Sequence, residues 1–184
     1  MKNLLLFLVF ACTFSFSCLG SPVPFSPIVR NYSVLDYNAG NENWAVAQDE
    51  RGVMYFGNNS GLLRYDGSRW KLFPLPTSGI VRAVYVASDR RIYVGSFEEF
   101  GYFEQNDLNL LEYHSLKEQV KGFDFHNDEI WTIVEQGGNI IFQSFGSYFI
   151  YDGKGTKGVR CPELPLNLFR IGDTLYSQLI NGGV

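Results

Sequence analysis

Charged residues are scarce in this chain of 184 residues, because Asp, Glu, Lys and Arg make up only 18% of it. Basic residues are the rarer kind, with 15 Lys and Arg against 19 Asp and Glu and a net charge of −4. A nucleic-acid surface needs a basic excess, so we expect no nucleic acid contact by this segment. Hydrophobic residues reach 46%, which excludes a disordered chain, since such chains lack the apolar surface for a core.

Cysteine is nearly absent from the part expected to fold. The chain has three cysteines, and Cys12 and Cys18 belong to the N-terminal stretch. Cys161 is left alone, so no disulfide framework is available within one chain, and we interpret it as a partly buried bystander thiol. Histidine and thiolate spacings typical of metal sites are also missing, and we predict neither a metal nor a cofactor.

Long hydrophobic runs are missing as well. The longest, Leu4–Cys12, has nine residues, follows the basic Lys2 and leads into small and polar residues before Pro22. A transmembrane helix needs ~20 apolar residues, whereas this pattern is typical of a secretory signal peptide. A buried N-terminal helix is the alternative. Cys18 is either removed with the signal or lipidated as the first mature residue.

Internal repeats are what the chain has instead. Trp44–Gly67 and Ile130–Gly153 superimpose, Arg82–Glu104 follows the same pattern, and a further copy starts at Leu168. One position of the second strand is held by Tyr55, Tyr93, Ile141 and Tyr176, at steps of 38, 48 and 35 residues. Such periods, with about four strands in each copy, are typical of propeller blades.

The strand pattern in each copy favours antiparallel hairpins. In the first copy the strands are expected at Trp44–Gln48, Val53–Gly57, Gly61–Tyr65 and Arg69–Phe73. The second strand is apolar throughout, as expected of a strand buried on both faces, whereas Trp70 and Leu72 alternate with charged residues. Asp66-Gly67 is a dipeptide favoured in hairpin turns.

The predicted fold class is therefore all-β: a β-propeller of four-stranded antiparallel blades, incomplete in this chain, with three blades and part of a fourth. A signal peptide is expected at residues 1–20, an extended lead-in at 21–43 and the partial propeller at 44–184, with blades at about 44–74, 80–114, 128–161 and 168–184. The longest step predicts an insertion between Gln105 and Asp128, with a short helical turn near Ser115–Val120. Because propellers use four to eight blades, the sequence is expected to be a piece of a longer protein.

Three stretches carry a resemblance to a known family: Asn43–Gly67, Val94–Tyr102 and Phe125–Trp131. They resemble the regulator-propeller repeats in the periplasmic sensor regions of Bacteroidetes-type transcriptional regulators and hybrid two-component sensors. The resemblance covers about residues 28–184. In that family the propeller is followed by a three-tyrosine immunoglobulin-like domain, a membrane helix and an output module of the LuxR, AraC or histidine kinase type.

The resemblance implies a non-catalytic, periplasmic sensory segment of a membrane receptor that regulates transcription. It implies as partners an extracellular ligand, with a glycan as one candidate, the remainder of the receptor chain, and a second copy in a homodimer. The full-length protein would be anchored in the inner membrane. The alternative is a secreted carbohydrate-binding or carbohydrate-active propeller, because acidic clusters on a propeller axis can bind or hydrolyse sugars. No Gly-x-Ser-x-Gly, phosphate-loop or dinucleotide motif supports another enzyme.

Four polar residues are the candidates for ligand binding: Glu98, Glu99, His126 and Asp128. His126 and Asp128 precede the first strand of a blade and could line a loop that meets a ligand. The architectural alternative, that they tie an inter-blade loop to backbone amides, is favoured because short polar side chains commonly do so. Glu98 and Glu99 lengthen a turn, and adjacent carboxylates on an exposed turn lack the ~5–9 Å separation of an acid–base pair, so we expect both to be solvated charges. No catalytic residue is predicted.

Overall fold

A computed structural model describes residues 27–77 and 79–182 of the chain. The predicted signal peptide therefore lies outside the described residues, as does the first part of the lead-in. The residues before Tyr32 are a separate unit, of which 27–31 are described and contain neither helix nor strand. Everything below concerns the unit that begins at Tyr32. Within the described ranges no helix is both long and apolar enough to span a bilayer.

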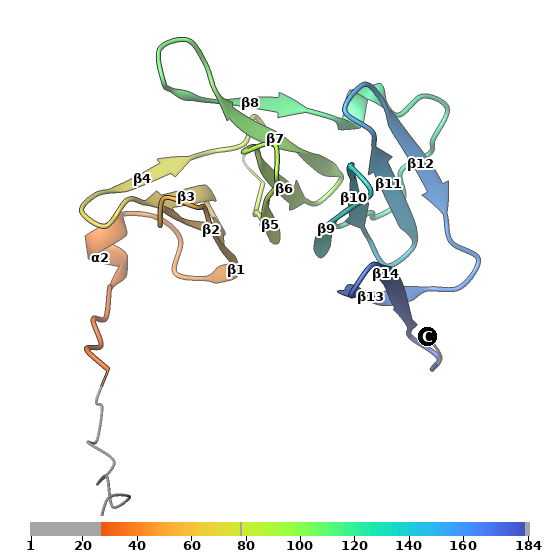
Figure 1. The fold of residues 1–184 in the computed structure, drawn as a ribbon, viewed down its shortest axis with the longest axis horizontal. Helices are drawn as coiled ribbons and strands as arrows, with labels where there is room; N and C mark the ends of the chain where they lie inside the picture. Colours follow the sequence, from red (N-terminus) through yellow and green to blue (C-terminus); the bar gives the residue numbers. More distant parts are fainter. Residues whose placement is uncertain (1–26, 78, 183–184) are drawn as a thin grey trace, which may run out of the picture. The chain divides into compact units, whose positions relative to one another are not determined.

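Three four-stranded antiparallel sheets follow one another in chain order (Figure 1). The first sheet contains β1 (Asn43–Gln48), β2 (Met54–Asn58), β3 (Gly61–Tyr65) and β4 (Trp70–Phe73). The second contains β5 (Ala83–Val86), β6 (Ile92–Ser96), β7 (Glu99–Gln105) and β8 (Leu111–Ser115). The third contains β9 (Thr132–Gln136), β10 (Asn139–Gln143), β11 (Ser147–Tyr151) and β12 (Thr156–Arg160). In each sheet the strands pair in sequence order, which is the meander of a propeller blade.

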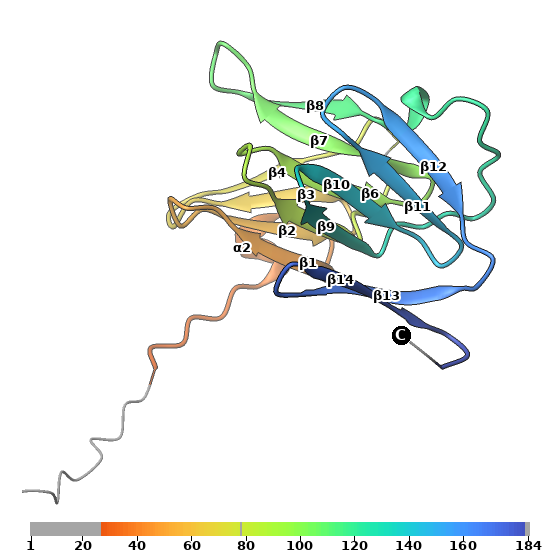
Figure 2. The same cartoon turned by 45° about the vertical axis from the view of Figure 1, so that its right-hand side comes forward.

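A two-stranded antiparallel sheet completes the unit, formed by β13 (Pro165–Ile171) and β14 (Thr174–Leu179). β13 packs against β9 and β10 of the third sheet, and Figure 2 shows the two sheets side by side. The first strands of successive sheets are also neighbours, since β1 packs on β5 and β5 on β9. The predicted fold, three blades and part of a fourth, is confirmed.

Two short helices differ from the expected local structure. Residues 34–37 form a helical turn, α2 (Val34–Tyr37), where the sequence predicts an extended lead-in. Ser33 and Asp36 make a reciprocal capping box at its start, which the proline content upstream does not reveal. The turn expected at Ser115–Val120 is a 3-10 helix, η1 (Lys117–Gln119), and it begins after Leu116 because the Ser115 hydroxyl bonds elsewhere.

The core consists of two apolar layers between neighbouring sheets. One layer lies between the first and second sheets and includes Leu62, Val81 and Val94, all fully buried. The other lies between the second and third sheets, where the Phe100 ring centroid is 4.8 Å from those of both Phe142 and Phe149. Aromatic pairs at this separation add to the stabilisation from burial. The aromatic residues therefore hold the sheets together.

One contact between sheets recurs along the chain. A Cβ atom at Gly57, at the end of β2, would lie 2.6 Å from the Val81 carbonyl oxygen, so the backbone of the next sheet's lead-in approaches it closely. Gly95, at the equivalent position of β6, is approached instead by the side chain of Ile130, whose Cβ would lie 2.6 Å from an added Cβ atom. In β10 the position is held by Gln143, whose side chain donates instead to the Pro165 carbonyl at 3.1 Å. This contact sets the spacing between consecutive sheets.

Candidate functional site

The structure brings two of the predicted site loops together. The Glu98 N–H donates to the Asp128 carbonyl oxygen at 3.0 Å, and the Asn127 N–H donates to Glu98 Oε1 at 3.0 Å. Glu98 has a φ of 46°, an uncommon conformation for a residue with a side chain, at the turn between β6 and β7. The turn of the second sheet is thus joined to the loop that enters the third.

The carboxylate of Glu99 is hydrogen-bonded within the second sheet and takes no part in this junction. It is buried, and its Oε1 accepts hydrogen bonds from Tyr113 Oη and Ser115 Oγ, each at 2.7 Å. Burial and the nearby carboxylate both raise the pKa of the Tyr113 phenol, which keeps it a donor. Glu99 therefore links β7 to β8 within one sheet.

Asp128 is the central group of the junction. Its side chain is 1% exposed and accepts hydrogen bonds from Ser144 Oγ at 2.7 Å and from the His126 N–H at 3.1 Å. Arg160 Nη1 lies 3.2 Å from Oδ2, which ties β12 to the loop. Burial alone would raise the pKa of Asp128, but the hydrogen bonds and the Arg160 charge outweigh it and lower the pKa. Asp128 thus has an architectural role, but two of its three partners are the side chains of Ser144 and Arg160, whereas the sequence predicted backbone amides.

His126 points to solvent. Its side chain is 69% exposed and pairs with Asp124, 84% exposed, at 2.8 Å. A pair this exposed contributes little to stability. The structure therefore does not assemble the four predicted residues into one pocket: Asp128 and Glu99 are buried in separate hydrogen-bonded groups, and His126 stands apart. No group of three or more His, Cys, Asp or Glu side chains in residues 27–77 and 79–182 is placed to hold a metal.

A second group of side chains lies where the first strands begin, and we call Trp44, Arg82 and Trp131 the inner-strand cluster. The Arg82 guanidinium carbon is 3.8 Å from the Trp44 ring centroid and 5.1 Å from that of Trp131. The two indole rings are 6.3 Å apart and nearly perpendicular. Arg82 Nε also donates to Glu129 Oε1 at 2.7 Å, so the cation is held by two rings and a carboxylate.

The three residues of this cluster hold one position of the repeat. Ala47 pairs with Tyr55, Tyr85 with Tyr93, and Val134 with Ile141, and each cluster residue lies three positions before the first member of a pair. In the repeats identified from the sequence, Trp44 corresponds to Ile130. A constant offset hides this equivalence, because the paired residues Val134 and Ile141 are one position closer in the chain than the corresponding pairs of the first two sheets.

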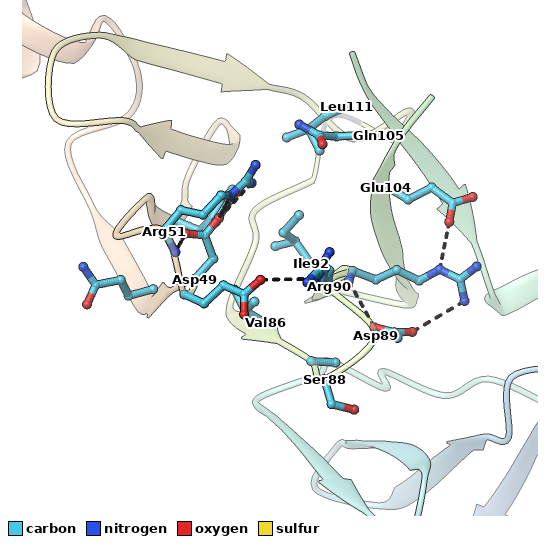
Figure 3. A pocket seen from close by; sticks show the side chains of 15 residues that line it. Asp49, Arg51, Val86, Ser88, Asp89, Arg90, Ile92, Glu104, Gln105 and Leu111 are labelled. Carbon is cyan, nitrogen blue, oxygen red and sulfur yellow. Dashed lines mark hydrogen bonds and ion pairs between the residues drawn. The ribbon is translucent and has the colours of Figure 1, made fainter. Parts of the chain in front are cut away.

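A groove of about 690 Å³ lies at the other end of the same strands, between the first and second sheets (Figure 3). Its charged side chains pair with one another: Arg51 with Asp49 at 3.0 Å, and Arg91 with Glu104 at 2.8 Å. Arg90, largely exposed, pairs with Glu50 at 3.2 Å. The charges of the groove are thus mutually satisfied, which makes it a less suitable ligand site than the inner-strand cluster.

Two arginines of this groove should differ sharply on substitution. We expect Arg91→Ala to lower the free energy of unfolding by about 1.5 kcal/mol, because Arg91 also stacks on Tyr102 at 4.4 Å. Arg90→Ala should change it by less than about 0.5 kcal/mol, because Arg90 is 83% exposed. Urea unfolding measures both free energies, and a loss for Arg91→Ala as small as that for Arg90→Ala would show that the Arg91 contacts do not stabilise the fold.

Comparison with solved structures finds this fold in known proteins. The extracellular domain assigned to the hybrid two-component system BT3049 of B. thetaiotaomicron aligns with 84% of this chain at 15% identity and a TM-score of 0.61. The aligned part is 21% of that domain's own length. The extracellular domain assigned to BT4673 from the same organism aligns with 78% of this chain at 15% identity and a TM-score of 0.60. The aligned part is again 21% of that domain's own length. Virginiamycin B lyase from Staphylococcus aureus matches 77% at 11% identity, with a TM-score of 0.58 over 53% of its length.

This chain has the propeller fold of these proteins. It spans about a fifth of the two sensor domains and about half of the lyase. No protein-family model matches the sequence, and no curated protein matches it. The fold that the regulator-propeller resemblance implies is therefore present. The activities of the similar structures belong to those proteins.

Proposed function

We propose that this chain is the sensory propeller segment of an exported membrane receptor that regulates transcription, and that the segment itself is non-catalytic. The observation that carries the proposal is the fold shared with extracellular domains of two hybrid two-component systems over 78% and 84% of the chain. The N-terminal pattern of a basic residue, an apolar run and small residues supports export to the periplasm. We further propose that the full-length protein is anchored in the inner membrane and forms a homodimer.

The arrangement of charges supports the non-catalytic part of this proposal. Glu99 and Asp128, the buried carboxylates among the predicted residues, are each held by at least two hydrogen-bond donors. The low pKa of Asp128 keeps it ionised at neutral pH, so it has no proton to donate as a general acid. The lyase shows that this fold can also carry an enzyme. A secreted carbohydrate-active or carbohydrate-binding propeller is therefore the competing function.

The coding sequence downstream of Val184 provides the direct test. We expect it to encode further blades, a membrane helix and a DNA-binding or kinase output module. A fusion of residues 1–184 to alkaline phosphatase should be active in the periplasm, and its activity should be lost when residues 1–20 are deleted. An open reading frame without a membrane helix, or turnover of polysaccharides by the purified chain, would overturn the proposal.

A further inference from the structure

The inner-strand cluster contains hydrogen-bond donors that the protein leaves without acceptors. Arg82 Nη1 and Trp131 Nε1 are both buried, and neither has a hydrogen-bond partner. Buried polar groups are nearly always paired, because an unmade hydrogen bond in a water-poor site costs stability. Two unpartnered donors on neighbouring side chains therefore indicate an acceptor supplied from outside the chain.

The Arg82 guanidinium is held ready for such an acceptor. Glu129 Oε1 accepts a hydrogen bond from Arg82 Nε at 2.7 Å, and the Trp44 ring centroid lies 3.8 Å from the guanidinium carbon. These two contacts fix the plane of the guanidinium. Nη1, on the other edge of the guanidinium, has no hydrogen-bond acceptor. A guanidinium edge matches the two oxygens of a carboxylate, and a fixed guanidinium loses little entropy on binding. The remaining donor, the Trp131 indole N–H, adds to the same preference for an acceptor.

Aromatic side chains beside these donors are exposed to solvent. Trp44 is 44% exposed and Phe145 is 40% exposed, and the Phe145 ring lies 5.6 Å from that of Trp131. Exposed aromatic surface next to a few convergent polar groups is typical of a small-molecule site. The Trp44 indole lies across the guanidinium and donates to Asn59 Oδ1 at 2.7 Å, so a partly exposed aromatic ring is held beside the donors.

The geometry points to the inner-strand cluster as a binding site for a carboxylate carried on a ring. The carboxylate accepts from the Nη1 edge of Arg82 and from Trp131 Nε1, and the ring packs on Trp44 and Phe145. Glu129 stays on the Nε edge as the positioning group for Arg82. This inference deepens the proposed function, because in a receptor the bound acid would be the signal. The role of the acid as a signal rests on the proposed function, whereas the binding of the acid does not.

Calorimetric titration of the full chain tests the site with three probes. Sodium D-glucuronate and sodium benzoate each carry a carboxylate on a ring, and D-glucose is the ring without the carboxylate. We expect saturable binding of at least one carboxylate and none of glucose. Binding of glucuronate alone identifies a sugar acid as the source, and binding of benzoate alone identifies a free aromatic acid. No saturable binding of either acid, or equal binding of glucose, would overturn the proposal.

Substitutions assign the binding to these residues. Arg82→Gln should weaken the carboxylate at least tenfold, and Trp131→Phe should weaken it several-fold because it keeps an aromatic ring but loses the N–H. Arg90→Gln, at the opposite end of the strands, is the matched control and should bind as the wild type does. Thermal melts followed by circular dichroism check folding, and if Arg82→Gln does not fold, Trp131→Phe decides. Unchanged affinity in a folded Arg82→Gln or Trp131→Phe protein refutes the site. Binding without any transcriptional response would overturn the receptor proposal alone.

Discussion

Gly95→Ala should lower the free energy of unfolding by about 3 kcal/mol. A Cβ atom at this position would lie 2.6 Å from Ile130 Cβ and closer still to Ile130 Cγ2. Ile130 is fully buried between the second and third sheets, so it has no space into which to move. The added methyl group must therefore push the two sheets apart or force Ile130 out of its rotamer. Urea unfolding followed by circular dichroism measures the loss.

Two variants test whether this contact is the cause. Gly155→Ala is the control, because nothing lies within 4 Å of a Cβ there, and it should change stability by less than about 0.5 kcal/mol. Ile130→Ala removes Cγ2, the atom that a methyl group at residue 95 would approach most closely, and leaves Ile130 Cβ in place. The double variant should therefore be more stable than the sum of the two single losses by at least about 1 kcal/mol. Strict additivity would mean that the sheets do not meet at Gly95.

The local pattern of the chain was predictable from sequence because each blade is built from short-range signals. Apolar second strands with alternating outer strands indicated the order of strands, and β3 lies at the predicted residues. Asp66-Gly67 indicated the turn before β4, where Asp66 Oδ1 accepts from the N–H groups of Ser68 and Arg69. These features depend on residues two to four positions apart, so they can be seen in a sequence.

The contacts between sheets were not predictable in the same way. Arg82 and Glu129 are separated by 47 residues, and only the packing of one sheet on the next brings them together. The hairpin of β9 and β10 is also one residue shorter between equivalent paired positions, which hides the equivalence of Trp44 and Trp131. Glu99 was expected to be solvated because it follows Glu98 in a turn. It is buried as the first residue of β7, where its carboxylate accepts hydrogen bonds from Tyr113 and Ser115 of β8, 14 and 16 residues further along the chain.

The recurring turn position explains why Asp128 belongs to the architecture. Equivalent positions at the ends of the second strands are held by Asn58 and Ser96, the last residues of β2 and β6, and by Ser144, which follows β10. Asn58 binds the loop ahead of its own sheet through the Gly40 N–H and carbonyl, at 2.9 and 2.8 Å. Ser144 does the same through Asp128 at 2.7 Å. Since Asp128 fills the place that backbone groups fill in the first sheet, its substitution should affect folding before it affects any ligand.

Asp128→Asn should lower the free energy of unfolding by about 2 kcal/mol at neutral pH, because charge-assisted hydrogen bonds are lost and an amide N–H₂ faces other donors. The pKa of Asp128 is lowered in the folded chain, so its stabilisation is complete above the ordinary carboxyl pKa of ~3.9 and is lost as the pH falls through the lower, folded value. The stability difference between wild type and variant should therefore shrink from pH 6 to pH 3. Asp124→Asn, 84% exposed, is the control and should change stability by less than about 0.5 kcal/mol. A difference that does not vary with pH would show that the Asp128 carboxylate is not the group that stabilises the loop.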